Sequence, residues 1–386
     1  MRRSGIRLFA LFALSLATGF AGCASSSSGT GPSASSRAAL AADLAAAPIP
    51  AAEHASRSAC AFVASPRGSD NARGTASAPF ATVQRLVRAL TPGHSGCLRA
   101  GTYHQYELRI RKAGRAGAPI TLRSWPGERA RIVVDSDIYL PPGTAHVTLR
   151  DLDLTNSARS SHTSAVMIQD FSDHSRYVGD HISGGRRATC MKLGQTGFGL
   201  ARGTQILGDS FSDCGDPAQG NQQHAIYVAG SRGAQITGNV FRNTAAYAIH
   251  LYPDADGARV TGNVIDGSGY GGVIFASDEN ATGLTSDDDV VSGNVISSGR
   301  RYGMTYFWGP GGRGTGDRAT DNCLAGNGRA INQPMPGIGL SGNVAVAVAG
   351  FVDARAGDFR LRPGASCAAV VGAAFNGRLA AARVAR

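Results

Sequence analysis

The chain has 386 residues, a formal net charge of +11, 52 glycines and 16 prolines. One repetitive domain and a leader account for this length without a second domain. The charge suits acidic polysaccharide or an anionic membrane surface, or only reflects an arginine-rich composition. Nucleic acid is not expected as a partner because no recognition motif appears, and we expect a monomer.

The N-terminus has the features of an export signal. Residues 1–22 combine a basic start, an apolar run and a small-residue exit, a pattern of signal peptides rather than membrane spans. Phe20-Ala21-Gly22-Cys23 resembles a bacterial lipoprotein processing site, although Leu is commoner than Phe at its start. The resemblance implies a lipid on Cys23, and Ala24 favours the outer membrane; plain secretion is the alternative. Residues 23–58 are expected to form a flexible Ser/Ala/Gly/Pro tether.

A single segment near the start of the folded part predicts a helix. In Phe80–Leu90, the apolar residues Val83, Leu86, Val87 and Leu90 recur at the helical spacing. Because the first coil of a solenoid exposes an apolar cross-section, such a helix is expected to cap it.

A short phrase ending in Gly-Asn or a close variant returns along the chain. Its Asp/Asn positions are Asp151, Asp180, Asp209, Asn239, Asn263, Asn294, Asn322 and Asn343. Spacings in the twenties to low thirties are typical of a solenoid. Asn and Asp bond backbone groups at turns and tolerate left-handed conformations, so we interpret the repeated position as structural.

Between the repeated positions, short runs alternate apolar and polar residues. Examples are Ala225–Val228 and Ala248–Leu251, and this period of two predicts strands. No helical stripe appears in the repeats, which excludes helical repeat classes. The fold class predicted is all-β: a single-stranded parallel β-helix solenoid with a short N-terminal capping helix.

Both ends of the repetitive region carry further motifs. They are Phe62–Asp70, Gly74–Gln84, Ala100–Tyr103, Gly117–Leu122 and Pro126-Gly127 at the start, and Gly350–Asp353 and Gly357–Gly364 at the end. This set resembles the right-handed parallel β-helix proteins of the pectate-lyase-like superfamily, over about residues 60–372. One departure is Cys367, where the closing motif usually carries Pro. The resemblance implies a right-handed β-helix over 59–373 and leaves 374–386 as a tail. It implies no single activity, because the superfamily holds lyases, hydrolases, epimerases and proteins without known activity.

Apart from Cys23, six cysteines remain. An even number in an exported chain favours disulfides. Sequence order suggests the pairs Cys60–Cys97, Cys190–Cys214 and Cys323–Cys367, out of fifteen formal connectivities.

The repeated Asn serves as a ruler for aligning coils. Eleven residues beyond Asn239 lies His250, and the corresponding strand centres on the two preceding coils are Tyr227 and Lys192. Their apolar neighbours point inward, so the three are expected to point outward in one column, about one strand spacing apart. Lys192 is one of two lysines, and lysine, unlike arginine, can release its proton. An acid/base set is one interpretation, and chance surface positions are the other.

Further candidates surround this column. His224 ends a long connection, 214–223, which is expected to form a wall of a groove. The candidates for binding sugar are Tyr252, Tyr302, Trp308 and Arg232. Aromatic rings of this kind either stack on sugars or lie in the core.

A second column is acidic. It consists of Asp254 and Asp278 on adjacent coils, with Asp256 and Glu279 close by. Stacked carboxylates repel one another unless they are protonated, paired or bridged by a cation. An oxygen-rich cluster outside the cell suits Ca²⁺, and arginines such as Arg232 are the alternative. The run 287–289, three aspartates, is expected to be solvated.

These candidates favour a polysaccharide lyase that cleaves an acidic, uronate-containing glycan by β-elimination. Lys192 is the expected base and Tyr227 or His250 the acid, while arginine or Ca²⁺ holds the carboxylate. Uronate lyases of this fold resemble the plan, although no lyase signature matches residue by residue. The alternatives are a glycoside hydrolase that uses Asp254 and Asp278 and a non-catalytic lipoprotein that binds glycan or cell envelope.

Overall fold

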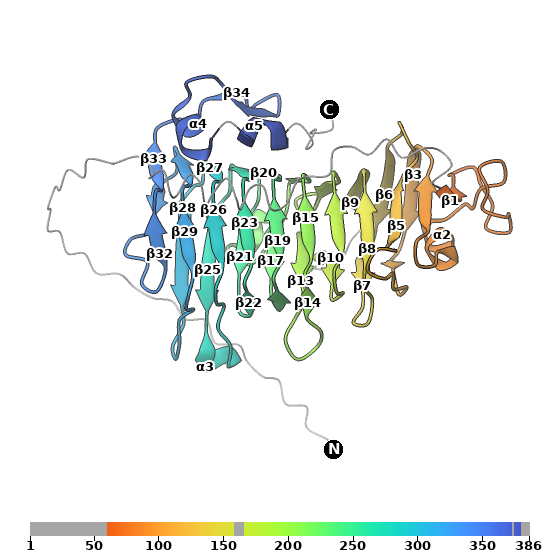
Figure 1. The fold of residues 1–386 in the computed structure, drawn as a ribbon, viewed down its shortest axis with the longest axis horizontal. Coiled ribbons are helices and arrows are strands. Elements are labelled where there is room, and N and C mark those ends of the chain that lie inside the picture. The colour runs from red at the N-terminus through yellow and green to blue at the C-terminus, as the bar shows by residue number, and fades with distance from the viewer. Residues whose placement is uncertain (1–59, 158–165, 373, 380–386) are drawn as a thin grey trace, which may run out of the picture. The chain divides into compact units, whose positions relative to one another are not determined.

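The computed structural model describes residues 60–157, 166–372 and 374–379. They form a parallel β-helix in which three sheets are built up coil by coil (Figure 1). This confirms the predicted fold class. The signal segment, Cys23 and the tether lie outside the described residues.

The strands of the 11-stranded sheet are β1 (Cys60–Ala64), β2 (Ser95–Leu98), β5 (Ile120–Ser124), β8 (Val147–Arg150), β11 (Arg176–Val178), β15 (Gln205–Leu207), β19 (Gln235–Thr237), β23 (Arg259–Thr261), β26 (Val290–Ser292), β29 (Arg318–Thr320) and β32 (Gly339–Ser341). Those of the nine-stranded sheet are β4 (Leu108–Arg109), β7 (Ile138–Leu140), β10 (Val166–Asp170), β13 (Thr189–Leu193), β17 (Ile226–Val228), β21 (Tyr247–Leu251), β25 (Gly271–Ser277), β28 (Tyr302–Trp308) and β31 (Arg329–Ile331). Those of the 10-stranded sheet are β3 (Gly101–Gln105), β6 (Ala130–Val134), β9 (Leu152–Asn156), β12 (His181–Ser183), β16 (Ser210–Ser212), β20 (Val240–Arg242), β24 (Val264–Asp266), β27 (Val295–Ser297), β30 (Cys323–Ala325) and β33 (Val344–Val346).

The remaining elements are short. A three-stranded sheet holds β14 (Ala201–Arg202), β18 (Ser231–Arg232) and β22 (Ala255–Asp256), and a hairpin holds β34 (Phe351–Asp353) and β35 (Asp358–Leu361). The helices are α2 (Val83–Ala89), α3 (Glu279–Thr282), α4 (Ser366–Val371), α5 (Ala374–Leu379) and a 3₁₀ turn, Pro217–Gln219. Among the described residues, no helix is long and apolar enough to span a membrane.

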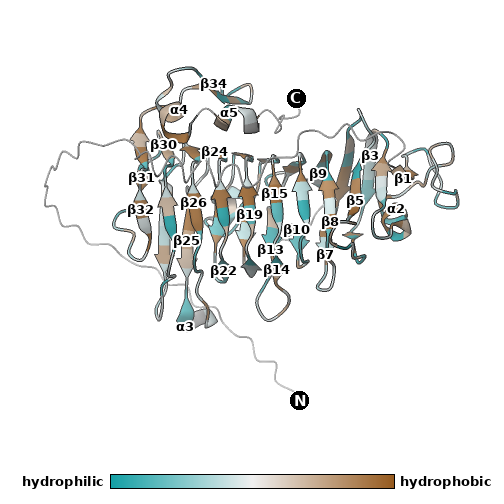
Figure 2. Ribbon diagram, viewed as in Figure 1, coloured by the Kyte–Doolittle hydropathy of each residue, from teal (hydrophilic) through white to brown (hydrophobic). Residues whose placement is uncertain are grey.

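Strand alternation places the core. In β17, Ile226 and Val228 are fully buried while Tyr227 between them is half-buried. Figure 2 shows hydrophobic and hydrophilic residues following one another within the strands. Burial of one face on every coil fixes the register, because a slip of one residue would turn each apolar side chain outward.

The repeated Asn forms a buried ladder along one turn of the solenoid. The backbone N–H of Asn239 donates to Oδ1 of Asn263 at 2.9 Å, and Nδ2 of Asn239 donates to the carbonyl of Ile206 at 2.9 Å. The same two contacts recur at Asn263, Asn294 and Asn322. The structural interpretation of the repeated phrase is therefore confirmed.

Aspartates occupy this ladder in the earlier coils. The backbone N–H of Asp180 donates to Oδ1 of Asp209 at 2.7 Å, and that of Asp209 to Oδ1 of Asn239 at 2.8 Å. The Oδ2 atoms of both aspartates are buried without a hydrogen-bond partner. Burial raises the pKa of Asp180 to about 7 and that of Asp209, which also faces Asp180, well above its usual range. A protonated carboxyl is favoured because only it can donate as the asparagine amide does.

A second buried ladder corrects one expectation. Asp289, expected to be solvated, is fully buried, and its Oδ1 accepts from the backbone of Ala258 at 2.7 Å. Its own N–H donates to Asp317 at 2.9 Å. A charge run reveals nothing about which member turns toward the coil below, so the burial of Asp289 was not visible in the sequence.

Helix α2 caps the first coil, as predicted from Phe80–Leu90. The hydroxyl of Thr82 accepts from the N–H of Arg85 at 3.1 Å, and Leu90 leaves the helical conformation. The Gln84 side chain donates to the carbonyl of Arg109 at 3.0 Å and accepts from its N–H at 2.9 Å. Gln84 thereby satisfies the backbone of the terminal strand β4, whose outer edge would otherwise be open to pairing.

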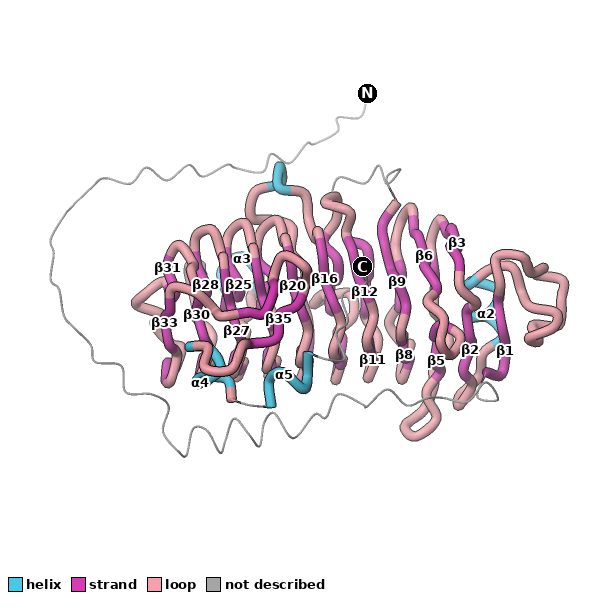
Figure 3. Tube along the Cα trace, turned by 90° about the horizontal axis from the view of Figure 1, so that it is seen from above, coloured by secondary structure: helices cyan, strands magenta, loops and turns pink. Residues whose placement is uncertain are grey.

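The C-terminal segment is part of the folded unit. Phe375 and Leu379 of α5 are buried in a cluster with Val240, Val264 and Val295. Figure 3 shows α4 and α5 beside β20, β27 and β30, and Figure 2 shows hydrophobic residues on α4. The predicted tail boundary at 374 is therefore wrong for residues 374–379, whose apolar side chains cover an apolar outer face of the 10-stranded sheet.

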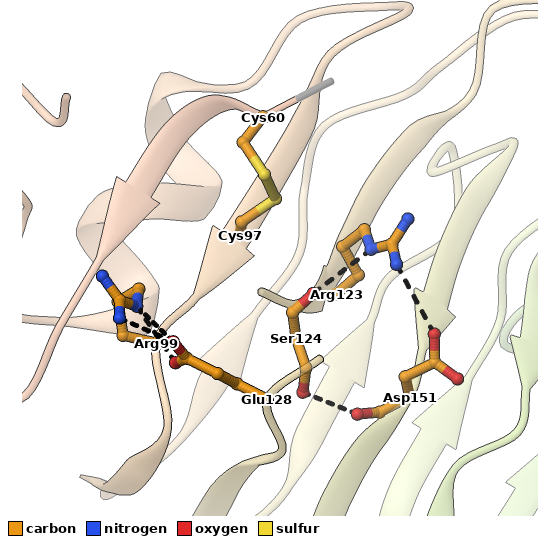
Figure 4. The surroundings of a disulfide bond; sticks show 7 residues. All are labelled: Cys60, Cys97, Arg99, Arg123, Ser124, Glu128 and Asp151. Carbon is orange, nitrogen blue, oxygen red and sulfur yellow. Dashed lines mark hydrogen bonds and ion pairs between the residues drawn. A yellow bond between two sulfur atoms is a disulfide. The ribbon is translucent and has the colours of Figure 1, made fainter. Parts of the chain in front are cut away.

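All three suggested disulfides are present. Cys60–Cys97 joins β1 to β2 (Figure 4), Cys190–Cys214 links strand β13 to the connection that follows β16, and Cys323–Cys367 ties α4 to β30. The first two pairs join neighbouring coils, and the third fixes α4 to the 10-stranded sheet.

Replacing Asp209 with Asn should raise the free energy of unfolding at pH 7 by about 1–3 kcal/mol, because the amide supplies the missing donor. The pKa of Asp209 is raised on folding. Its carboxyl therefore stabilises the wild-type fold fully below about pH 4 and loses this contribution as pH rises through the folded value. Between pH 4 and 8, the melting temperature of Asp209→Asn should fall less steeply than that of the wild-type protein. The melting temperature of the matched control Asn263→Asp should fall more steeply. Equal declines in all three proteins would contradict this account of the ladder.

Candidate functional site

The structure places the predicted column on the outer face of the nine-stranded sheet. Strand register pairs Gln169 with Lys192, Lys192 with Tyr227, and Tyr227 with His250. Each of the last three is half-buried between fully buried neighbours. The alignment of Lys192, Tyr227 and His250 from the spacing of the repeats is confirmed.

Lys192 and Tyr227 face an open cleft of about 550 Å³. Tyr252 and Pro253 line it from the following coil, and two loops form its walls. One loop contributes Gln195, Thr196 and Gly197, and the other contributes Thr282 and Leu284. The expected wall at 214–223 does not line this cleft. That connection instead closes on itself, with Gln223 accepting from the N–H of Asp216 at 2.8 Å.

Lys192 is held as a partly desolvated amine. Its Nζ donates to Oε1 of Gln195 at 2.8 Å and lies 5.5 Å from the centre of the Phe171 ring. Burial lowers the pKa of Lys192. Desolvation is the one cause of this shift, and it increases the fraction of the amine that is neutral and able to accept a proton near the cleft.

Tyr227 has the opposite tendency. Burial, and to a lesser degree Tyr252, raise the pKa of Tyr227 well above its ordinary value. The phenol therefore stays protonated and suits proton donation. Its ring stacks 6.5 Å from that of Tyr252, whose own pKa burial also raises.

The half-buried His250 and the buried His224 form a pair beside this cleft. Nδ1 of His250 and Nε2 of His224 are 2.9 Å apart, and His224 is 2 % exposed. Burial lowers the pKa of His250 to about 3 and that of His224 well below its usual range. These shifts favour the neutral form of both rings near pH 7. The centre of the His250 ring lies 5.2 Å from that of Tyr227 and 5.4 Å from that of Tyr252, so the three rings form a cluster. Tyr227 lines the cleft and His250 does not, so the histidines fit a supporting role behind the tyrosines.

Two of the four acidic candidates, Asp254 and Asp256, form ion pairs with Arg232. Asp254 is 2 % exposed, forms an ion pair with Nη1 of Arg232 at 2.8 Å and accepts from the Thr196 hydroxyl. Asp256 pairs with Nε of the same Arg232 at 3.1 Å. These contacts engage both oxygens of Asp254, whereas Oδ1 of Asp256 is buried without a hydrogen-bond partner. Calcium, which takes six to eight oxygen ligands, stays a prediction here.

The other acids do not complete a metal site. Asp278 and Glu279 lie at the start of the α3 loop, and Thr282 bonds the carbonyl of Asp278 rather than its carboxylate. Among the described residues, no group of three or more His, Cys, Asp or Glu side chains is placed to hold a metal ion.

The aromatic candidates separate by the face that they occupy. Tyr252 lines the cleft. Tyr302 pairs with Gly271, in the column of Tyr247, away from the column of Lys192. Trp308 packs against the core and donates its indole N–H to the carbonyl of Pro336 at 2.7 Å. Trp308 is half-buried and its indole N–H is already bonded, so its stacking on a sugar stays a prediction.

Other aromatic residues lie beside Lys192 that the sequence did not single out. Phe171 contacts Tyr139 at 5.7 Å and Phe198 at 4.8 Å between ring centres, and Phe198 is 56 % exposed. The signal that the sequence offered for this loop was a phenylalanine between two glycines, Gly197 and Gly199.

The comparisons with known proteins bear on the fold and on part of the chain. Residues 143–345, more than half of the 386, match the family described as the right handed beta helix region. Pectate lyase PEL9 of Emericella nidulans is 36% identical over 107 residues, which are 28% of this chain and 24% of that protein. The uncharacterized protein YwoF of Bacillus subtilis is 28% identical over 131 residues, 31% of this chain and 28% of that one. The matched part thus spans about a quarter of the length of these relatives.

Two solved structures extend the comparison. A glycoside hydrolase has a TM-score of 0.51 at 8% identity and covers 73% of this chain and 96% of its own. Pectate lyase Pel9A has a TM-score of 0.46 at 12% identity, with 79% and 90% covered. At such identity the likeness to the glycoside hydrolase concerns the fold alone. With coils in parallel register and a family match over most of them, the chain belongs to the right-handed β-helix family.

Proposed function

We propose that this protein is a lyase that cleaves a uronate-containing polysaccharide by β-elimination, with Lys192 as the base and Tyr227 as the acid. The observation that carries the proposal is the composition of the cleft. An amine and a phenol face it from neighbouring strands, and no carboxylate is among the residues that line it. A glycoside hydrolase of the usual kind needs two carboxylates across the bond. The identity to pectate lyase PEL9 over 107 residues supports the lyase class.

The geometry suits the two proton transfers of this reaction. The base removes the proton from C5 of the uronate, the electron pair forms the C4–C5 double bond, and the C4–O bond breaks while the acid protonates the leaving oxygen. Lys192 and Tyr227 are register partners, so their α-carbons lie about 4.8 Å apart. Two groups at this spacing can act on adjacent carbons of one sugar.

Burial adjusts both groups in the catalytic direction. It favours the neutral amine of Lys192, which accepts a proton, and the neutral phenol of Tyr227, which donates one. The His224–His250 pair stays uncharged beside them, so it adds no positive charge that would hold the phenol in its ionised form.

Lys192→Arg and Lys192→Ala should each lower kcat/KM by about 10²–10⁴. Arginine keeps the positive charge but does not release its proton. The Lys192→Arg variant therefore distinguishes a role of Lys192 as base from a role as a cation that only binds the substrate. Tyr227→Phe should cause a comparable loss while the ring stacking is kept. The assay is near-ultraviolet absorbance of the unsaturated product on a panel of uronate polymers. Each assay is run once with a chelator and once with added calcium. This separates the effect of the substitution from any effect of a dissolved cation that binds the uronate carboxylate.

Full activity of Lys192→Arg with an unchanged melting temperature would refute the base assignment. If the wild-type protein releases neither unsaturated product nor new reducing ends from any polymer, the lyase proposal fails and glycan binding without catalysis replaces it.

The pH profile of kcat/KM should have an alkaline optimum. Activity rises as Lys192 loses its proton, with a midpoint below the ordinary lysine value of about 10.4, because burial lowers its pKa. It falls only where Tyr227 ionises, above the ordinary tyrosine value of about 10, because burial raises that pKa. Initial rates across pH 5–11 on a protein shown to stay folded provide the measurement. An optimum below pH 6 would be incompatible with these two roles.

A further inference from the structure

A second cleft, of about 610 Å³, lies at the N-terminal end of the same sheet. Its charged lining consists of four cations, Arg88, Arg109, Arg111 and Lys112, and one carboxylate, Glu107. Tyr106, which is 68 % exposed, also lines it. The cleft therefore carries an excess of positive charge beside an exposed aromatic ring.

This N-terminal cleft is in line with Lys192. Strand register pairs Arg109 with Tyr139, Tyr139 with Gln169, and Gln169 with Lys192. Arg109 and Lys192 thus belong to one outward column, three strand spacings apart, or roughly 14 Å. A polymer lying along the column at Lys192 would reach the N-terminal cleft.

Most of the positive charge in this cleft is uncompensated. Glu107 pairs with Arg109 at 2.5 Å, and the Arg109 guanidinium lies 5.2 Å from the centre of the Tyr139 ring. Arg88, Arg111 and Lys112 are exposed, and none of them takes part in an ion pair within the described residues. Three free cations at one end of the column favour a ligand with several negative charges.

Hydrogen bonds and burial fix the backbone that carries Arg88, Arg109 and Arg111. Leu108 and Ile110 are buried, so alternation turns Arg109 and Arg111 outward. Gln84 of α2 bonds both backbone groups of Arg109, which fixes the helix that carries Arg88 against strand β4. The spacing between Arg88 and Arg111 is therefore set by the fold rather than by a loose loop.

Aromatic rings fill the interval between the two clefts. Tyr139, Phe171 and Phe198 form a chain of ring contacts, and Lys192 lies over Phe171. Apolar faces of sugar rings pack on such surfaces, while the carboxylates of the same polymer carry charge to the cations.

We propose that the N-terminal cleft is a distal subsite for the carboxylate groups of an anionic polysaccharide, several sugar units from the bond at Lys192. The inference rests on the proposed function for the identity of the polymer. It adds that long anionic chains bind more tightly than short ones, and that the difference depends on Arg88, Arg111 and Lys112.

The test compares two triple variants that each remove three positive charges. One is Arg88→Gln/Arg111→Gln/Lys112→Gln, and the control is Arg131→Gln/Arg187→Gln/Arg318→Gln, exposed arginines on other parts of the solenoid. Binding to polygalacturonate and alginate is measured by calorimetry at low and at physiological salt, in the Lys192→Ala background to prevent turnover. Dextran serves as the uncharged polymer and trigalacturonate as the short ligand.

We expect the subsite variant to bind the anionic polymers at least fivefold more weakly, with a shallower salt dependence and unchanged binding of the trisaccharide. The control should bind the polymers as the parent does. Equal losses in both triple variants, equal losses for polymer and trisaccharide, or no polymer binding by the parent would overturn the subsite. With Lys192 intact, a higher KM for polymer at unchanged kcat supports the subsite. Polymer binding that depends on the three cations, without any lyase product, would refute the lyase and keep the subsite.

Discussion

The structure depends on one constraint, the in-register stacking of parallel coils. Each coil takes its position from backbone hydrogen bonds to the coils on either side, and the Asn/Asp ladder satisfies the turn between them from within. Because the stacking repeats at one strand spacing, residues as far apart in sequence as Lys192 and Tyr227 become neighbours on one face of a sheet. The Lys192–Tyr227–His250 column and the link from Lys192 to Arg109 both follow from it.

The same stacking decides the electrostatics of the site. A half-buried side chain on an outward column has neighbours above and below, so it loses water without entering the core. For Lys192 and Tyr227 this desolvation favours the neutral forms. For His224 and His250, which contact tyrosine rings, it lowers the pKa of His250 to about 3 and that of His224 well below its usual range. Desolvation thus has two outcomes. Lys192 and Tyr227 can exchange protons in the cleft, whereas His224 and His250 stay neutral beside them.

Much of this could be read from the sequence because it is periodic. The spacing of the Gly-Asn phrase predicted the column, and the apolar period of Phe80–Leu90 predicted the cap. The cysteine pairs followed from their order. The features that the sequence did not predict are those that no repeat or periodic pattern describes. The walls of the cleft come from loops 194–199 and 282–284, whose paths no repeat describes. The ion pair of Asp254 with Arg232 escaped as well, because it depends on side-chain direction beyond strand register.

The proposed chemistry requires that the fold hold Lys192 as a partly desolvated amine in a cleft whose lining has no carboxylate. The chain has one other lysine, Lys112, so reductive methylation with ¹³C-formaldehyde yields few signals, and the one missing in Lys192→Arg belongs to Lys192. We expect a pH titration of that signal by NMR to have its midpoint below the ordinary lysine value of about 10.4. A midpoint at or above that value would mean that the fold does not favour the neutral amine.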